Sequence, residues 1–189
     1  LFALLAFGVG VVMWQTGTTA PMDMTAKGIS KTSYGALFAI NGVLIALLQP
    51  RMTSWLALRP RAWVLAISAL VFGLGFGLFG FVSTPAGYAI GIAIWTVGEI
   101  AHLPTSNTVV ADLAPASLRG RYQGIYSMSW GFGSVAAPIV GGAILDGPGS
   151  LVLWVGCAVL MALVGVCQLG LGASIRERAS RPEPATAAG

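Results

Sequence analysis

A glutamate and a histidine three residues apart are the side chains of this sequence best suited to proton transfer. Glu99 and His102 lie near the middle of an apolar segment that runs from about 86 to 113. Residues with this spacing share one face of a helix. If the helix crosses a bilayer, the pair lies near its middle depth, where an ionisable group is costly unless it faces a cavity or a partner. The pair is therefore our first candidate for a functional site.

The composition indicates that lipid surrounds this helix. Hydrophobic residues make up 56% of the 189 residues and charged residues only 8%, whereas a soluble domain carries about 25% charged residues. Because so few charges cannot cover the surface of a globular protein, we expect a lipid bilayer to cover much of this protein. The net charge of +4 does not indicate nucleic acid, because the basic residues form no patch with interleaved aromatic residues.

Six apolar runs have about the length of roughly 20 residues that a membrane-spanning helix needs. They cover residues 1–19, 31–49, 62–82, 86–113, 120–145 and 150–173. A polar connection over 20–30 separates the first two runs, and Pro50 closes the second. The polar tail at 174–189 has no apolar periodicity, and we expect it to be disordered. The sequence thus predicts an all-α membrane protein with six transmembrane helices.

The charges predict the orientation of these helices. Eight arginines lie in the connections after the second and fourth runs and in the tail: Arg51, Arg59, Arg61, Arg119, Arg121, Arg176, Arg178 and Arg181. The connections on the other side hold only Lys27 and Lys31. Because basic residues accumulate on the cytoplasmic side, we expect both termini in the cytoplasm and the protein in the inner (plasma) membrane.

The remaining reactive residue types favour packing roles. Cys157 and Cys167 lie ten residues apart in the last run, roughly 15 Å along a helix, which is too far for a disulfide. His102 is the only histidine, so a zinc site would have no second histidine ligand. We expect no metal and no cofactor. The chain opens at Leu1 without a basic leader, which argues against a signal peptide and favours a segment of a longer membrane protein.

One constellation between the fourth and fifth runs resembles a known family. It consists of Glu99 and Pro104, the sequence VADLAP at 110–115, the sequence LRGRYQG at 118–124, and a glycine-rich run containing Pro138. This pattern resembles the tenth and eleventh spans of major facilitator superfamily transporters, and most of all bacterial drug:proton antiporters. The resemblance implies the C-terminal half of the superfamily's fold, which is a bundle of two inverted three-helix repeats.

The resemblance also implies roles for individual residues. In that superfamily the first and fourth helices of each half line the central cavity. Glu99 would then couple transport to protons, and His102 would tune it or bind substrate. Asp112, Arg119 and Arg121 would form a cytoplasmic charge latch. The other candidates for the substrate cavity are Trp14, Gln15, Thr18, Asn41, Ser106, Tyr126 and Trp130.

Structural roles are the alternatives for these residues. Glu99 could be a neutral acid that bonds a neighbouring helix, and His102 a packed side chain with one backbone partner. Asn41 could join two helices through its amide. The charges of the latch could be a solvated ion pair, which contributes roughly 0–1 kcal/mol.

The predicted function is transmembrane transport of a small molecule by a secondary, proton-coupled transporter of the drug or multidrug efflux type. Its partners would be the substrate, protons and an N-terminal six-helix half, in the same chain or as a second subunit. The alternative is a non-transporting membrane assembly or sensor protein. An intramembrane serine protease would need Ser127 or Ser129 activated by His102, but the sequence contains no Gly-x-Ser-x-Gly turn. We therefore do not expect an enzyme.

Overall fold

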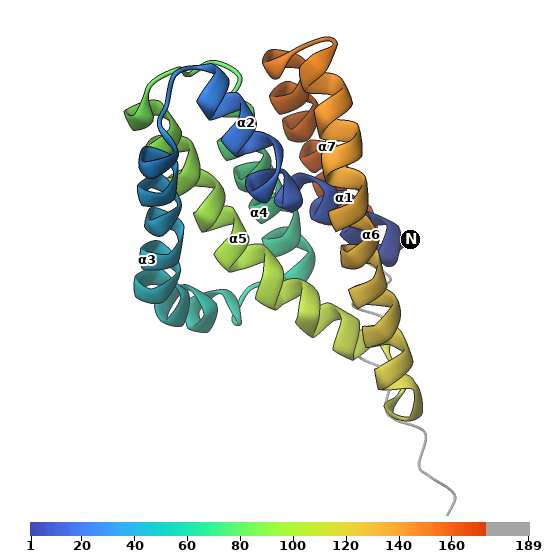
Figure 1. The fold of residues 1–189 in the computed structure, drawn as a ribbon. Coiled ribbons are helices and arrows are strands. Elements are labelled where there is room, and N and C mark those ends of the chain that lie inside the picture. The colour runs from blue at the N-terminus through green and yellow to red at the C-terminus, as the bar shows by residue number, and fades with distance from the viewer. Residues whose placement is uncertain (173–189) are drawn as a thin grey trace, which may run out of the picture.

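The computed structural model describes residues 1–172, and every regular element in that range is a helix. The elements are α1 (Phe2–Trp14), η1 (Gln15–Gly17), α2 (Thr19–Ala26), α3 (Lys31–Leu56), α4 (Arg61–Leu78), α5 (Pro85–Leu113), η2 (Ala116–Leu118), α6 (Arg119–Asp146) and α7 (Ser150–Gly170). The long helices form one bundle (Figure 1). This architecture confirms the all-α fold class, while the predicted tail at 174–189 lies outside the described residues.

Up to six helical segments are able to cross a membrane. Within residues 1–172, the helices α3, α4, α5, α6 and α7 are each long and apolar enough to do so. The sixth segment is a bent pair, in which α1 with η1 meets α2 at an angle of 43°. The first apolar segment of the chain is therefore a broken helix.

The broken helix extends further than the sequence predicted. Instead of a polar connection over 20–30, α2 continues the helical path to Ala26. The break lies at Thr18, whose Oγ1 donates a hydrogen bond to the carbonyl oxygen of Trp14 at 2.9 Å. From α3, the hydroxyl of Tyr34 donates to the carbonyl oxygen of Thr16 at 2.7 Å. Side chains thus bond backbone groups around the break, which is how membrane helices tolerate such interruptions.

Three prolines, Pro50, Pro104 and Pro138, lie inside long helices without ending them. The sequence predicted that Pro50 closes the second span, but α3 continues to Leu56. A proline removes one backbone hydrogen bond, and membrane helices accommodate that loss through neighbouring groups. Helices α5 and α6 likewise continue well beyond Pro104 and Pro138.

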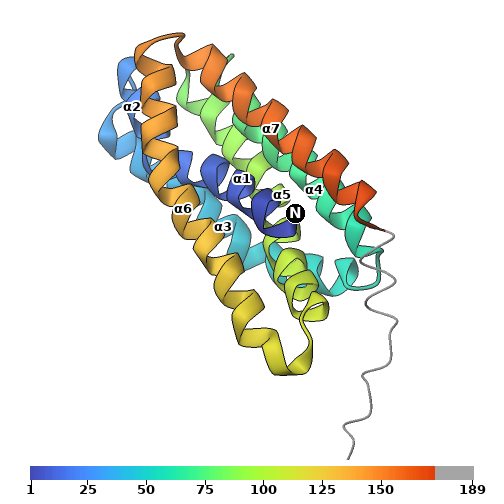
Figure 2. The same ribbon diagram turned by 90° about the vertical axis from the view of Figure 1, so that its right-hand side faces the viewer.

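Helix α4 is packed between α5 and α7, and α7 lies beside it along most of its length (Figure 2). Glycines permit this close approach. A Cβ added at Gly73 would come within 2.6 Å of the Cβ of Met161, and one added at Gly77 within 2.9 Å of the Cβ of Ala158. The small-xxx-small pattern of α4 thus makes the contact with α7.

Helices α3 and α6 lie on opposite sides of the bundle and are the least covered (Figure 1). Only 6% of the most apolar window of α3 is buried, and 22% of the window that contains α6, compared with 56% for α4 and for α5. Their apolar faces need lipid or another helical bundle to cover them.

Candidate functional site

Helix α5 carries the candidate carboxylate near the middle of its length. The helix begins at Pro85, and the side chain of Thr84 accepts a hydrogen bond from the backbone N–H of Gly87 at 3.2 Å. A proline in the first turn and a threonine cap are both typical of helix starts. The resulting 29-residue helix places Glu99 about halfway between its ends, where the side chain is only 7% exposed.

A single amide holds the carboxyl group of Glu99. Asn41 on α3 donates from Nδ2 to Glu99 Oε2 at 2.8 Å and to Thr96 Oγ1 at 3.0 Å. The Thr96 hydroxyl in turn donates to the carbonyl oxygen of Ile92 at 2.6 Å. Within residues 1–172, no basic side chain forms an ion pair with Glu99 and no third ligand completes a metal site. The carboxyl group therefore joins α5 to α3 through a neutral partner.

His102 bonds to a different helix. It is 2% exposed, and its Nδ1 lies 3.0 Å from Ser68 Oγ on α4. Ser68 Oγ has one hydrogen, which it donates to the carbonyl oxygen of Leu65 at 3.0 Å. In the bond between His102 and Ser68, the N–H of His102 Nδ1 is therefore the donor and Ser68 Oγ is the acceptor. Within residues 1–172, no hydrogen bond or ion pair joins His102 to Glu99. The two side chains thus serve two different helix contacts.

The side chain of Gln15 is buried and bonds within the bundle. It is 1% exposed; its Nε2 donates to the carbonyl oxygen of Ala137 on α6 at 3.2 Å, and its Oε1 accepts from the Thr19 hydroxyl at 2.6 Å. Of the other candidates in this broken helix, Thr18 bonds its own backbone. The side chain of Trp14 is 44% exposed.

The last three cavity candidates are mostly buried between α5 and α6. Ser106 is 2% exposed and Tyr126 is 7% exposed. The Tyr126 ring lies 6.4 Å from the ring of Trp130 and 6.4 Å from that of Phe2. These aromatic residues join α1 to α6, whereas Asn41 lies at the separate contact with Glu99. The candidates therefore divide into two groups.

Asp112 of the predicted charge latch pairs with an arginine other than Arg119 and Arg121. Asp112 at the end of α5 contacts the guanidinium group of Arg61 at the start of α4. Arg119 and Arg121 are exposed, and neither forms an ion pair with a carboxylate of residues 1–172. The pair forms with Arg61 because α4 and α5 pack side by side, a contact that proximity in the sequence does not reveal.

A buried ion pair at the opposite end of the bundle was missed by the sequence analysis. Asp23 is 3% exposed, and its Oδ2 accepts hydrogen bonds from Lys27 Nζ at 3.0 Å, Tyr88 OH at 2.7 Å and Trp154 Nε1 at 2.9 Å. The hydrogen bonds of the Asp23 carboxylate therefore join α2 to α5 and α7. The spacing of Asp23 and Lys27, which places them one helical turn apart, was the available signal, but the segment was interpreted as a connection.

Comparison with known proteins identifies the family. Residues 2–189 match the sequence model of the Major Facilitator Superfamily. The chain belongs to the major facilitator superfamily. Its helices form an all-α bundle that is consistent with one half of a major facilitator membrane fold. The superfamily is one of transporters rather than of enzymes.

The relatives of this chain carry transporter names. A Na(+), Li(+), K(+)/H(+) antiporter of Planococcus maritimus is 35% identical over 109 residues, which is 58% of this chain and 26% of that protein. The MFS-type transporter YttB of Bacillus subtilis (strain 168), which is named as uncharacterized, is 27% identical over 172 residues, or 85% of this chain and 42% of that protein. The efflux pump FUS6 of Gibberella fujikuroi is 36% identical over 77 residues, or 41% of this chain and 14% of that protein. The chain thus matches less than half of the length of each of these relatives.

Proposed function

We propose that this chain is the C-terminal half of a secondary, proton-coupled transporter of the efflux type. In this proposal it moves against an N-terminal six-helix half, so that a cavity between the halves opens to each side of the membrane in turn. The poorly covered apolar faces of α3 and α6 support a large partner bundle. The partial coverage of the longer relatives agrees with this proposal.

Glu99 is the proposed proton carrier. The observation that carries this role is its burial in a membrane helix with a neutral amide as its partner. A carboxylate at membrane depth is costly without a cation, so exchange of a proton against a cation is a physical way for it to change charge. Because the Asn41 amide belongs to α3, a movement of α3 relative to α5 would open the carboxyl group to water. His102, bonded to Ser68, would then hold α4 and α5 together.

The proposed substrate is a cation, because an ionised Glu99 attracts positive charge. The name of the antiporter gives one class, which is monovalent metal ions, and the drug-efflux type that we propose gives a second class, which is organic cations. We favour an organic cation, because the half-exposed ring of Trp14 offers an aromatic surface for it. The arginine-rich end of the bundle is the proposed cytoplasmic side, which would place both termini in the cytoplasm.

Proton flux in proteoliposomes tests this function. The full transporter, with Glu99→Gln and with Asp146→Asn as a matched control at an exposed helix end, is given an imposed pH gradient and then Na⁺, K⁺ or an organic cation such as ethidium. We expect the unaltered protein and the control to release protons on addition of a cation, and Glu99→Gln to lose the response. Equal flux from Glu99→Gln, with folding intact, would reject the role of Glu99. No flux from the unaltered protein would favour the assembly or sensor alternative.

A further inference from the structure

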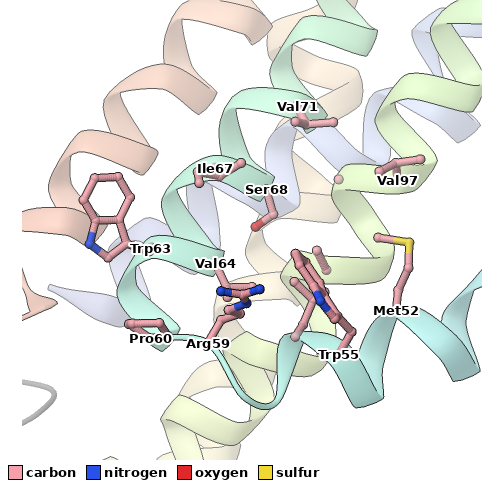
Figure 3. A pocket seen from close by; sticks show the side chains of 13 residues that line it. Met52, Trp55, Arg59, Pro60, Trp63, Val64, Ile67, Ser68, Val71 and Val97 are labelled. Atoms are coloured by element: carbon pink, nitrogen blue, oxygen red, sulfur yellow. The ribbon is translucent and has the colours of Figure 1, made fainter.

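An apolar groove opens on the side of the bundle between α3, α4 and α5 (Figure 3). Its volume is about 540 Å³, within the range of roughly 300–1,000 Å³ that small-molecule sites occupy. Its walls are mainly hydrophobic and include Met52 from α3, Ile67 and Val71 from α4, and Val97 from α5. No residue assigned to the proposed transport path lines this groove, except that Ser68, the partner of His102, reaches its wall.

The mouth of the groove carries an arginine that has no counter-ion among residues 1–172. Arg59 lies in the short connection between α3 and α4, and its guanidinium carbon is 4.6 Å from the ring centre of Trp55. The neighbouring Arg61 is neutralised by Asp112, whereas Arg59 pairs with no carboxylate of residues 1–172. Trp55 is 57% exposed, and such tryptophans gather at the boundary between lipid and water. The mouth therefore offers a positive charge at headgroup level.

The groove has the depth of one lipid leaflet. Along α4 its lining runs from Pro60 near the mouth to Val71, a distance of roughly 16 Å at the helical rise of 1.5 Å per residue. Half of a hydrocarbon core is about 15 Å thick. On the opposite wall Val97 lies close to the middle of α5 and is 36% exposed. The groove can therefore follow an acyl chain from its ester end towards the centre of the bilayer.

We infer that this groove binds one anionic phospholipid, with its phosphate group on Arg59 and an acyl chain between α3, α4 and α5. The charge at the mouth favours an anionic headgroup, because guanidinium and phosphate form strong charge-assisted hydrogen bonds. The apolar walls favour a hydrocarbon chain. The inference requires that the chain spans a membrane, but it does not depend on transport or on the side that faces the cytoplasm.

Native mass spectrometry of the full, delipidated protein tests the inference. Phosphatidylglycerol and phosphatidylcholine with identical acyl chains are titrated separately, and bound lipids are counted. We expect Arg59→Gln to weaken phosphatidylglycerol binding roughly fivefold, as the loss of about 1 kcal/mol per basic residue near the surface implies. Val97→Trp, which fills the deep end of the groove, should remove the same bound lipid. Arg119→Gln and Leu163→Trp, both at exposed positions away from the groove, are the matched controls.

The pattern over these variants decides between the occupants. Loss with Arg59→Gln but not with Val97→Trp would leave only a surface charge contact and overturn the groove site. Equal binding of the two lipids that is sensitive only to Val97→Trp would indicate a general apolar pocket and would also overturn the inference. Ile67→Trp from the facing wall repeats the filling test if Val97→Trp lowers the thermal unfolding temperature. A failure of the flux assay leaves all these lipid counts unaffected, so the two proposals fail separately.

Discussion

Replacing Asp23 by asparagine tests whether the buried ion pair holds the broken helix in place. The substitution keeps the size of the side chain and removes its charge. Three donors meet at Oδ2 of Asp23, from Lys27, Tyr88 and Trp154. Lys27 also donates to the carbonyl oxygen of Phe79 at 3.0 Å, just after α4. The loss of one charge therefore affects contacts from α2 to α4, α5 and α7.

The magnitude follows from burial. Removing one partner of a buried ion pair costs about 3–5 kcal/mol, because the other charge is left without compensation. Lys27 has a side chain that is 22% exposed, so water can partly solvate it, and we expect Asp23→Asn to cost about 3 kcal/mol, at the lower end of that range. Lys27→Met should cost at least as much, because it leaves the carboxylate of Asp23, which is only 3% exposed. In the double variant neither charge is stranded, so its cost should be smaller than the sum of the two single costs.

Unfolding of the purified protein in detergent micelles, followed by tryptophan fluorescence during titration with sodium dodecyl sulfate, measures these free energies. Asp146→Asn is the matched control, because that carboxylate lies exposed at the end of α6; we expect it to change the free energy of unfolding by less than about 0.5 kcal/mol. The reasoning would be refuted if Asp23→Asn were equally mild. Strict additivity of the Asp23→Asn and Lys27→Met effects would also refute it, because it would mean that the two side chains do not interact.

Three further substitutions test individual helix contacts by the same unfolding measurement. Gly98→Ala should destabilise the protein by about 1–3 kcal/mol, because the added Cβ would lie 2.7 Å from a backbone Cα of α4; a stability equal to that of the unaltered protein would mean that the two helices are not in close contact. Ser68→Ala should cost about 0.5–1.5 kcal/mol, since it removes the hydroxyl that bonds Nδ1 of the buried His102, and no loss would argue against that bond. Asp112→Asn should cost no more than about 1 kcal/mol, because the Asp112 and Arg61 side chains are 29% and 41% exposed; a much larger loss would indicate a coupled network.

The sequence by itself determined the class of the protein. Its few charges and long apolar runs require a membrane and helices, because only a helix bonds all of its own backbone groups within one segment in lipid. The family was also readable, since residues around 98–124 resemble the superfamily and its sequence model matches the chain. The position of Glu99 on an apolar helix followed from the same local pattern, and the structure finds that side chain buried.

The tertiary structure decided which side chains meet. Glu99 bonds an amide 58 residues away, and Trp154 bonds Asp23 across 131 residues. His102 turns to α4 although it lies only three residues from Glu99. Helical periodicity states which face of a helix a residue occupies, but not which helix lies against that face. That choice depends on close packing between helices, such as the approach that Gly73 permits, and packing energies arise only when the whole bundle is assembled.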